Sequence, residues 1–132
     1  MCIETTVPLV GVVDDDESVR ESLSRLMRSA GYRTALFASA DAFLNSEQIR
    51  HSNEIVLLVD IQMPGLSGLE LQRRLCDSQP SIPVIFLTAN DDKETRAAAL
   101  RQGAFAFLAK PFNDYAILSA ISSAIEAFSE RR

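Results

Sequence analysis

The sequence predicts an α/β fold in which five parallel strands form one sheet that carries helices on both faces. Apolar strand segments alternate five times with helical segments along the chain, which is the order from which such a sheet is built. Parallel neighbours need crossover connections, and the helices supply them. The third strand segment is apolar throughout, as is typical of a strand covered on both faces. With 132 residues, 47% of them hydrophobic, the chain is long enough for one domain with a sizeable core.

The first two predicted strands lie on either side of a helix. Residues 7–13 form the first strand, and residues 33–37 form a short second strand. Between them, apolar side chains recur at helical spacing, and Gly31 is placed to end that helix. This apolar stripe consists of Val19, Leu23, Leu26, Met27 and Ala30. After the second strand, Ser39 is placed to cap a second helix that is expected to run to about Ile49.

The third strand is predicted at residues 55–59, and a helix start follows it closely. Ser67 and Glu70 have the spacing of a capping box, in which the serine hydroxyl accepts a hydrogen bond from the amide three residues on and the glutamate reaches back. The third helix is therefore expected to begin at Gly68 and to run to about Asp77.

The last part of the chain repeats the alternation twice. Residues 82–87 form the fourth strand, and a helix opened by Asp91 or Asp92 is expected to end at Gly103. Residues 104–109 form the fifth strand. The last helix is indicated by its cap and by its predicted core stripe, which are Asn113 and then Leu118, Ile121, Ile125 and Phe128.

The composition excludes several functional classes. A formal net charge of −5 makes this domain a poor candidate for direct binding of nucleic acid. No apolar segment approaches the ~18–20 residues that a membrane span needs, and the N-terminal segment has no basic leader. Two cysteines, Cys2 and Cys76, indicate reduced thiols, and the one histidine, His51, indicates a solvated loop. We therefore expect one cytoplasmic domain over residues 1–132, with no effector domain in this chain and no membrane association.

Polar side chains follow four of the five predicted strands. Asp14 and Asp15 follow the first strand, Asp60 the third, Thr88 the fourth and Lys110 the fifth. The carboxyl ends of parallel strands meet at one edge of the sheet, so these five side chains are expected to share a shallow pocket there. Three carboxylates repel one another, and Mg²⁺, which prefers oxygen ligands, would relieve the repulsion. Asp60 is then suited to attack phosphorus, with charge from Lys110 and a hydrogen bond from Thr88 assisting.

Four motifs in this order resemble a known family over essentially the whole chain. VVDDDE, LLVDIQMPGLSG, VIFLTA and FLAKPF are together similar to the receiver domain of bacterial two-component response regulators. Longer sequence segments, such as GLSGLELQRRL and GAFAFLAKPF, are most similar to receivers of the nitrogen-fixation (FixJ-like) regulator type, which usually precede a DNA-binding helix-turn-helix domain. The resemblance implies a flavodoxin-like (α/β)5 sandwich with strand order 2-1-3-4-5.

The resemblance also implies a metal-dependent phosphoryl acceptor. Asp60 would receive a phosphoryl group from a sensor histidine kinase. Asp15 would bind Mg²⁺ directly, with Mn²⁺ a possible substitute, and Asp14 would act through water. Asp60 itself and the backbone carbonyl of Gln62 would complete the protein ligands. Asp16 is a third acid that the motif does not require, and its alternative role is a charge in the first turn of the helix.

The remaining implied roles concern switching. Lys110 would pair with the phosphoryl group, placed by a cis peptide bond before Pro111. Thr88 and Phe107 would be the switch pair: the threonine turns inward to the phosphoryl group, and the aromatic ring rotates in from solvent. This would repack the surface of the fourth helix, fifth strand and fifth helix and control a partner or an attached transcription-regulating output. We also hypothesise a homodimer at this surface, through residues expected to be partly exposed, namely Ile117, Ala120 and Ala124, with Arg96 and Arg101. The alternative is that the alanines are there only as good helix formers.

The protein is thus expected to be a switch that catalyses its own phosphorylation and dephosphorylation, not a turnover enzyme. The alternative is a Mg²⁺-dependent phosphatase of the haloacid dehalogenase type, which also uses an aspartate nucleophile. Such an enzyme needs a second aspartate two residues after the nucleophile, to act as a general acid or base. This chain has Gln62 at that position, which cannot transfer protons usefully. A flavodoxin-type binding module and a degenerate receiver are less favoured. The sequence leaves open the cognate kinase, the stimulus, the phosphoryl lifetime, the oligomeric state before phosphorylation, and whether the domain stands alone.

Overall fold

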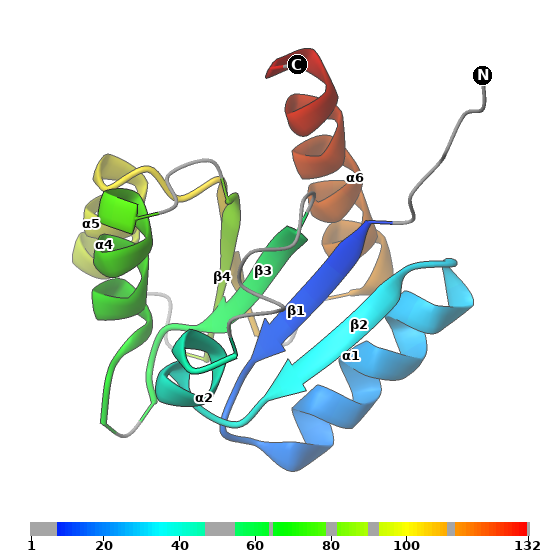
Figure 1. Ribbon diagram of the computed structural model, residues 1–132, viewed down its shortest axis with the longest axis horizontal. Coiled ribbons are helices and arrows are strands. Elements are labelled where there is room, and N and C mark those ends of the chain that lie inside the picture. Colours follow the sequence, from blue (N-terminus) through cyan, green and yellow to red (C-terminus); the bar gives the residue numbers. More distant parts are fainter. Residues whose placement is uncertain are drawn as a thin grey trace.

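The computed structural model describes residues 8–46, 55–63, 65–78, 82–89, 93–110 and 113–131. Its sheet has five parallel strands in the order β2-β1-β3-β4-β5 (Figure 1). The strands are β1 (Leu9–Val13), β2 (Arg33–Phe37), β3 (Ile55–Asp60), β4 (Val84–Thr88) and β5 (Ala106–Ala109). The helices are α1 (Glu17–Ser29), α2 (Ala40–Leu44), α4 (Gly68–Ser78), α5 (Lys93–Arg101) and α6 (Asp114–Arg131). The predicted fold class and strand order are confirmed.

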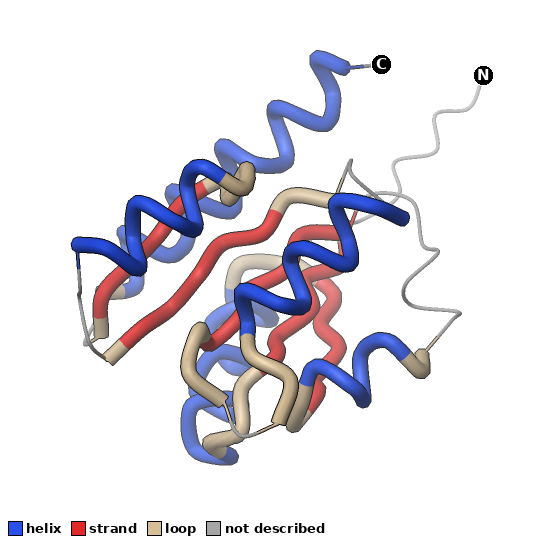
Figure 2. The backbone as a smooth tube through the Cα atoms, turned by 90° about the vertical axis from the view of Figure 1, so that its left-hand side faces the viewer, coloured by secondary structure: helices blue, strands red, loops and turns tan. Residues whose placement is uncertain are grey.

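Helices cover both faces of the sheet (Figures 1 and 2). Alternate residues of β1 and β3 point to opposite sides, so each face carries its own hydrophobic core. One core receives side chains from α2, α4 and α5, among them Phe43, Leu71 and Ala99. The other receives side chains from α1 and α6, among them Met27 and Ile121. Burial on both faces explains why β1, β3 and β4 are apolar almost throughout.

The second helix is shorter than the sequence predicted. Ser39 caps it as expected, because its hydroxyl accepts a hydrogen bond from the Ala42 amide at 3.1 Å. The helix ends at Leu44 and not near Ile49. Its buried anchor is Phe43, and the amide of Ser46 already donates to the Phe43 carbonyl in a tighter turn. The last residues of the predicted helix, 47–49, lie outside the described residues.

The last helix turns a different face to the sheet from the one predicted. Ile117, Ile121 and Ala124 are fully buried, whereas Leu118 and Ile125 are only half-buried. Both sets recur at helical spacing and differ by a small rotation about the helix axis, which sequence periodicity cannot resolve. The expectation that Ile117 and Ala124 lie partly exposed on a dimer surface is therefore wrong. Ala120 is half-buried, and the side chain of Phe128 lies outside the described residues.

A close approach of α4 to β3 holds the end of the central strand in place. A Cβ atom on Gly68 would lie 2.7 Å from the carbonyl oxygen of Asp60 and 2.9 Å from the Cα of Ile61, so only glycine fits there. The predicted cap is present, because the hydroxyl of Ser67 accepts from the Glu70 amide at 3.2 Å. The carboxylate of Glu70 faces Arg73 and Arg74 on the next turn. In the part of the chain that the structure describes, no helix has the length and apolarity to cross a membrane.

Candidate functional site

Two of the predicted acids sit where β1 ends. The amide of Asp14 donates to the carbonyl of Phe37 at 3.1 Å, which continues the contact with β2 for one residue beyond the strand. The side chain of Asp14 is completely buried, whereas Asp15, the next residue, is exposed. The carboxyl end of β1 therefore presents one sequestered carboxylate and one accessible carboxylate.

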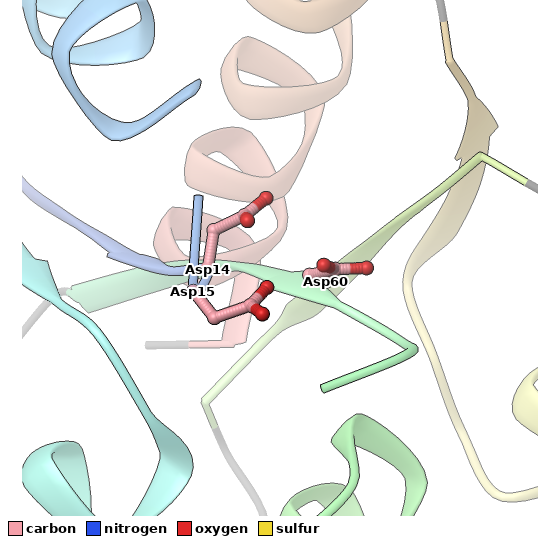
Figure 3. Close-up of side chains that lie close together, drawn as sticks. All are labelled: Asp14, Asp15 and Asp60. Atoms are coloured by element: carbon pink, nitrogen blue, oxygen red, sulfur yellow. The ribbon is translucent and has the colours of Figure 1, made fainter. Parts of the chain in front are cut away.

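Asp60 is the last residue of β3, paired in register with Leu87 of β4. It is only 7% exposed, and its Oδ1 accepts a hydrogen bond from the Gln62 amide at 3.1 Å. Carboxylate oxygens of Asp14, Asp15 and Asp60 lie within 4.8 Å of one another (Figure 3). The three carboxylates thus converge as the order of the strands predicted.

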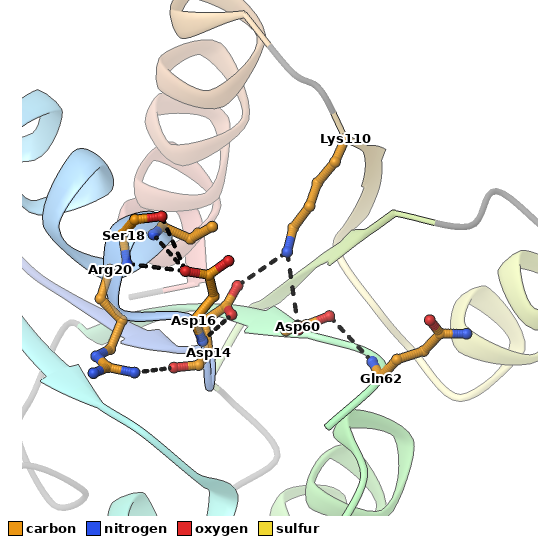
Figure 4. A network of polar contacts seen from close by, with 8 residues as sticks. Asp14, Asp16, Ser18, Arg20, Asp60, Gln62 and Lys110 are labelled. Carbon is orange, nitrogen blue, oxygen red and sulfur yellow. Dashed lines mark hydrogen bonds and ion pairs between the residues drawn. The ribbon is translucent and has the colours of Figure 1, made fainter. Parts of the chain in front are cut away.

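Lys110 reaches into this acidic cluster from the end of β5. Its Nζ lies 3.2 Å from Oδ2 of Asp14 and 3.9 Å from Oδ2 of Asp60 (Figure 4). Its amide donates to the Thr88 carbonyl at 2.6 Å, which ties the end of β5 to the end of β4. The peptide bond between Lys110 and Pro111, expected to be cis, lies outside the described residues.

The charge in the cluster is only partly offset by Lys110. Burial raises the pKa of Asp60 to about 6, from an ordinary value of 3.8. The hydrogen bond from the Gln62 amide lowers this pKa, the charge of Asp14 raises it, Lys110 lowers it and Asp15 raises it. A buried carboxylate with two acidic neighbours favours a cation beside it, and a set of oxygen donors suits a hard divalent ion. These residues therefore fit Mg²⁺.

Asp16 has a different role from its two neighbours. Its Oδ1 accepts from the Ser18 amide at 2.9 Å and from the Val19 amide at 3.4 Å, so it is the N-cap of α1. Hydrogen bonds from the Ser18 hydroxyl and amide lower the pKa of Asp16. It lies outside the group of three carboxylates that could hold a metal ion. Asp14 and Asp15 lie together with Asp60, and their role as metal ligands stays a prediction. The alternative role given to Asp16, a charge in the first turn of the helix, is replaced by that of the N-cap.

The two residues predicted to form a switch pair, Thr88 and Phe107, are both buried. Thr88 is the last residue of β4, pairs in register with Ala109 and has no exposed surface. Phe107 was expected to rotate in from solvent, yet it is only 7% exposed. Its ring centroid lies 6.4 Å from that of Phe86, and the Cζ of Arg96 lies 5.0 Å from it. The expectation of a solvent-facing ring is wrong for this structure, because α5 covers the ring with an arginine.

Sequence reasoning missed Arg20. Its Nη1 donates to the carbonyl oxygen of Asp14 at 2.7 Å, from the first turns of α1 (Figure 4). The available signal was spacing: Arg20 stands four residues after the N-cap Asp16, so it lies one turn above the acidic loop. The backbone amide of Gln62 donates a hydrogen bond to Asp60. The role of the Gln62 carbonyl as a metal ligand stays a prediction.

Comparisons with known proteins agree with this geometry. The family profile of the response regulator receiver domain matches residues 10–122. The chain is 40% identical to Nodulation protein W of Bradyrhizobium diazoefficiens over 128 residues, covering 97% of this chain and 56% of that protein. It is 37% identical to the transcriptional regulatory protein FixJ of the same species, covering 92% of this chain and 58% of FixJ. A receiver domain structure from Clostridium thermocellum superposes with a TM-score of 0.89 at 27% identity, covering 96% of this chain and all of that one.

These similarities bear on the two main alternatives. The chain spans a little over half the length of Nodulation protein W and of FixJ. The similarity to receivers extends over nearly the whole chain and includes relatives of the expected nitrogen-fixation type. The alternative of a haloacid dehalogenase-type phosphatase is not supported.

Proposed function

We propose, from the premise that this chain belongs to the response regulator receiver family, that it accepts a phosphoryl group on Asp60 in a reaction that depends on a divalent cation. One observation carries the proposal. The carboxylate of Asp60 stands at the end of the central strand, with the carboxylates of Asp14 and Asp15 and the ammonium of Lys110 gathered around it. Nucleophile, metal-binding oxygens and a positive charge are thereby grouped in one place.

Asp15 and Asp60 are the carboxylates that would hold the cation directly. Both oxygens of Asp14 already have partners, namely the amide of Asp16 at 2.9 Å and Nζ of Lys110 at 3.2 Å, which suits an indirect role through water. The carbonyl of Gln62 would be a further ligand. Mg²⁺, or Mn²⁺ in its place, would supply positive charge to the carboxylates and to the phosphoryl oxygens when bound.

The phosphoryl donor would be a phosphohistidine of a sensor histidine kinase. An oxygen of Asp60 attacks phosphorus, the phosphorus–nitrogen bond breaks, and its electron pair returns to the imidazole. Lys110, 3.9 Å from Asp60 before transfer, would pair with a phosphoryl oxygen. The hydroxyl of Thr88 would donate a hydrogen bond to another phosphoryl oxygen. Water attacking the same phosphorus later would restore the carboxylate, so the domain acts as a switch and not as a turnover enzyme.

Phosphorylation adds about two negative charges at the mouth of the sheet. Changing a two-state population from 1:99 to 99:1 takes about 5.5 kcal/mol of differential binding. Hydrogen bonds to charged groups contribute roughly 1.5–3 kcal/mol each, so two or three new bonds would suffice. Phe107 is already buried, so inward movement of Thr88 would stabilise the position that the ring occupies here. The affected surface would be that of α5, β5 and α6. These elements are the predicted fourth helix, fifth strand and fifth helix.

The output is proposed from the relatives. The matched segment covers only 56% of Nodulation protein W and 58% of FixJ, and FixJ is named as a transcriptional regulatory protein. We propose that this domain works in the cytoplasm, does not itself bind nucleic acid, and controls a transcription-regulating output that is attached or separate. Phosphorylation would favour a homodimer through α5, β5 and α6, with Arg96 and Arg101 contributing. Sedimentation with beryllofluoride and Mg²⁺ tests this dimer, and an unchanged monomer at high concentration would count against it.

The acceptor role is tested by labelling with acetyl phosphate in the presence of Mg²⁺. Intact mass should increase by one phosphoryl group, and an Asp60→Asn variant should show no increase. Asp77→Asn is the matched control, because Asp77 is an exposed carboxylate on α4 and should leave labelling unchanged. Labelling of the Asp60→Asn protein at the wild-type rate would remove Asp60 from this role. Omission of Mg²⁺ with EDTA should also abolish the mass increase.

A further inference from the structure

We infer that Arg20 is a positioning residue for the metal site, because it fixes the peptide group that joins the two metal-site aspartates of the β1 loop. The inference rests on the proposed function, since it presumes that Asp14 and Asp15 serve a cation. Arg20 is half-buried on α1 and donates from Nη1 to the carbonyl oxygen of Asp14 at 2.7 Å (Figure 4). A bond of that length from a charged donor is among the stronger hydrogen bonds in proteins.

The acceptor atom explains why this contact matters. The carbonyl of Asp14 belongs to the planar peptide group between Asp14 and Asp15. Rotation of that group would redirect the Asp15 side chain, which is exposed and therefore depends on its backbone for its direction. Arg20 restrains this rotation through the carbonyl oxygen of Asp14. The Phe37 carbonyl holds the amide of Asp14, which belongs to the preceding peptide group, so the backbone is restrained on both sides of the Asp14 Cα. The two contacts come from α1 and β2.

Asp14 is restrained at each of its polar atoms. Its amide bonds to β2, its carbonyl to Arg20, its Oδ1 to the Asp16 amide and its Oδ2 to Lys110. The backbone amide of Arg20 also donates to the Asp16 carbonyl at 3.0 Å, so the same residue closes the first turn of α1 beneath the loop. Arg20 thus connects the helix rigidly to the loop that carries the acids.

The effect on metal affinity has two opposing contributions. Removing the positive charge of Arg20 would by itself favour a nearby cation, by about twofold for a half-exposed group screened by water. Removing the restraint would disfavour the cation, because residues that orient metal ligands typically contribute about 10–100-fold to affinity. The restraint is the larger contribution, so loss of Arg20 should weaken binding even though a positive charge is lost.

The experiment measures Mn²⁺ affinity by electron paramagnetic resonance of the free ion, in the whole chain and without any phosphoryl donor. Arg20→Ala should weaken Mn²⁺ binding about tenfold, and Arg20→Lys, which keeps the charge and a donor, should lie between it and wild type. Arg25→Ala is the matched control, since Arg25 is an exposed arginine on the same helix. It also removes one positive charge, and it should leave the Kd within about twofold of the wild-type value. Circular dichroism and urea unfolding establish that each variant is folded.

A second readout needs no metal. Hydrogen exchange of the Asp16 amide, which donates to Oδ1 of Asp14, should become faster in Arg20→Ala than in Arg25→Ala. Equal or tighter Mn²⁺ binding by Arg20→Ala overturns the positioning role, whether or not exchange changes. If the wild-type protein fails to bind Mn²⁺, or if its affinity for Mn²⁺ equals that of Asp60→Asn, the proposed metal site is refuted and the inference with it. Wild-type binding that needs Asp60 but not Arg20 would refute the inference alone.

Discussion

Replacing Asp60 with asparagine should stabilise the metal-free protein at neutral pH. Burial raises the pKa of Asp60 to about 6 from 3.8, so the fold favours its protonated form. That contribution to stability is complete below about pH 4 and is lost as pH rises through about 6. A shift of roughly 2 units corresponds to at most about 3 kcal/mol. The free energy of unfolding of Asp60→Asn should therefore exceed that of wild type by an amount that grows over this pH range.

Urea unfolding followed by far-ultraviolet circular dichroism measures this difference, with EDTA present, from about pH 4 to about pH 7.5. Comparing the two proteins at each pH cancels the titration of the other acids. Mg²⁺ at the upper pH should then stabilise wild type, by the linkage of binding to folding, and should leave Asp60→Asn almost unchanged. A difference between the proteins that does not vary with pH would refute the reasoning. Asp77→Asn, on an exposed position, should follow wild type throughout.

Three further predictions concern residues around the site. Gly68→Ala should destabilise the fold by more than about 2 kcal/mol in urea unfolding, because its Cβ would lie 2.7 and 2.9 Å from backbone atoms of Asp60 and Ile61. A loss of less than about 0.5 kcal/mol would show that α4 moves away freely. Arg96→Ala should shift the fluorine resonance of 4-fluorophenylalanine at Phe107 toward its solvent-exposed value, since the guanidinium covers that ring at 5.0 Å, and an unmoved signal would contradict this. Asp16→Ala should cost about 1 kcal/mol of stability through the lost cap but leave Mn²⁺ affinity within about twofold, and a much larger loss of affinity would place Asp16 in the metal site.

The convergence of the acidic cluster could be predicted from the sequence because it follows from topology alone. Once β1, β3 and β5 are parallel, their carboxyl ends meet at one edge, and Asp14, Asp60 and Lys110 meet with them. Capping by Ser39, Ser67 and Asn113 was equally predictable, since each cap is a local pattern within four residues.

Features that depend on a choice between similar packings were not predictable. On α6, the apolar residues at 117, 121 and 124 and those at 118, 121 and 125 form overlapping stripes, and the sheet selects one by shape. The Phe107 ring lies between Phe86 and Arg96, which come from two other elements of the chain. The contact of Arg20 depends on the reach of a long side chain across a loop. Periodicity carries no information about any of these three.

The contacts of Lys110 and Gln62 in the cluster predict different tasks for Asp14 and Asp60. Nζ of Lys110 is 3.2 Å from Oδ2 of Asp14, within hydrogen-bond distance, but 3.9 Å from Oδ2 of Asp60. The Gln62 amide holds only Oδ1 of Asp60. Oδ2 of Asp60 is therefore the more weakly held oxygen, and we expect it to be the one with a lone pair available to attack phosphorus. We expect Asp14 to keep the lysine close to that oxygen without itself attacking phosphorus, because every polar atom of Asp14 is already bonded. Asp14→Asn should thus slow phosphorylation chiefly by displacing Lys110, and a variant that retains the wild-type rate would contradict this division of tasks.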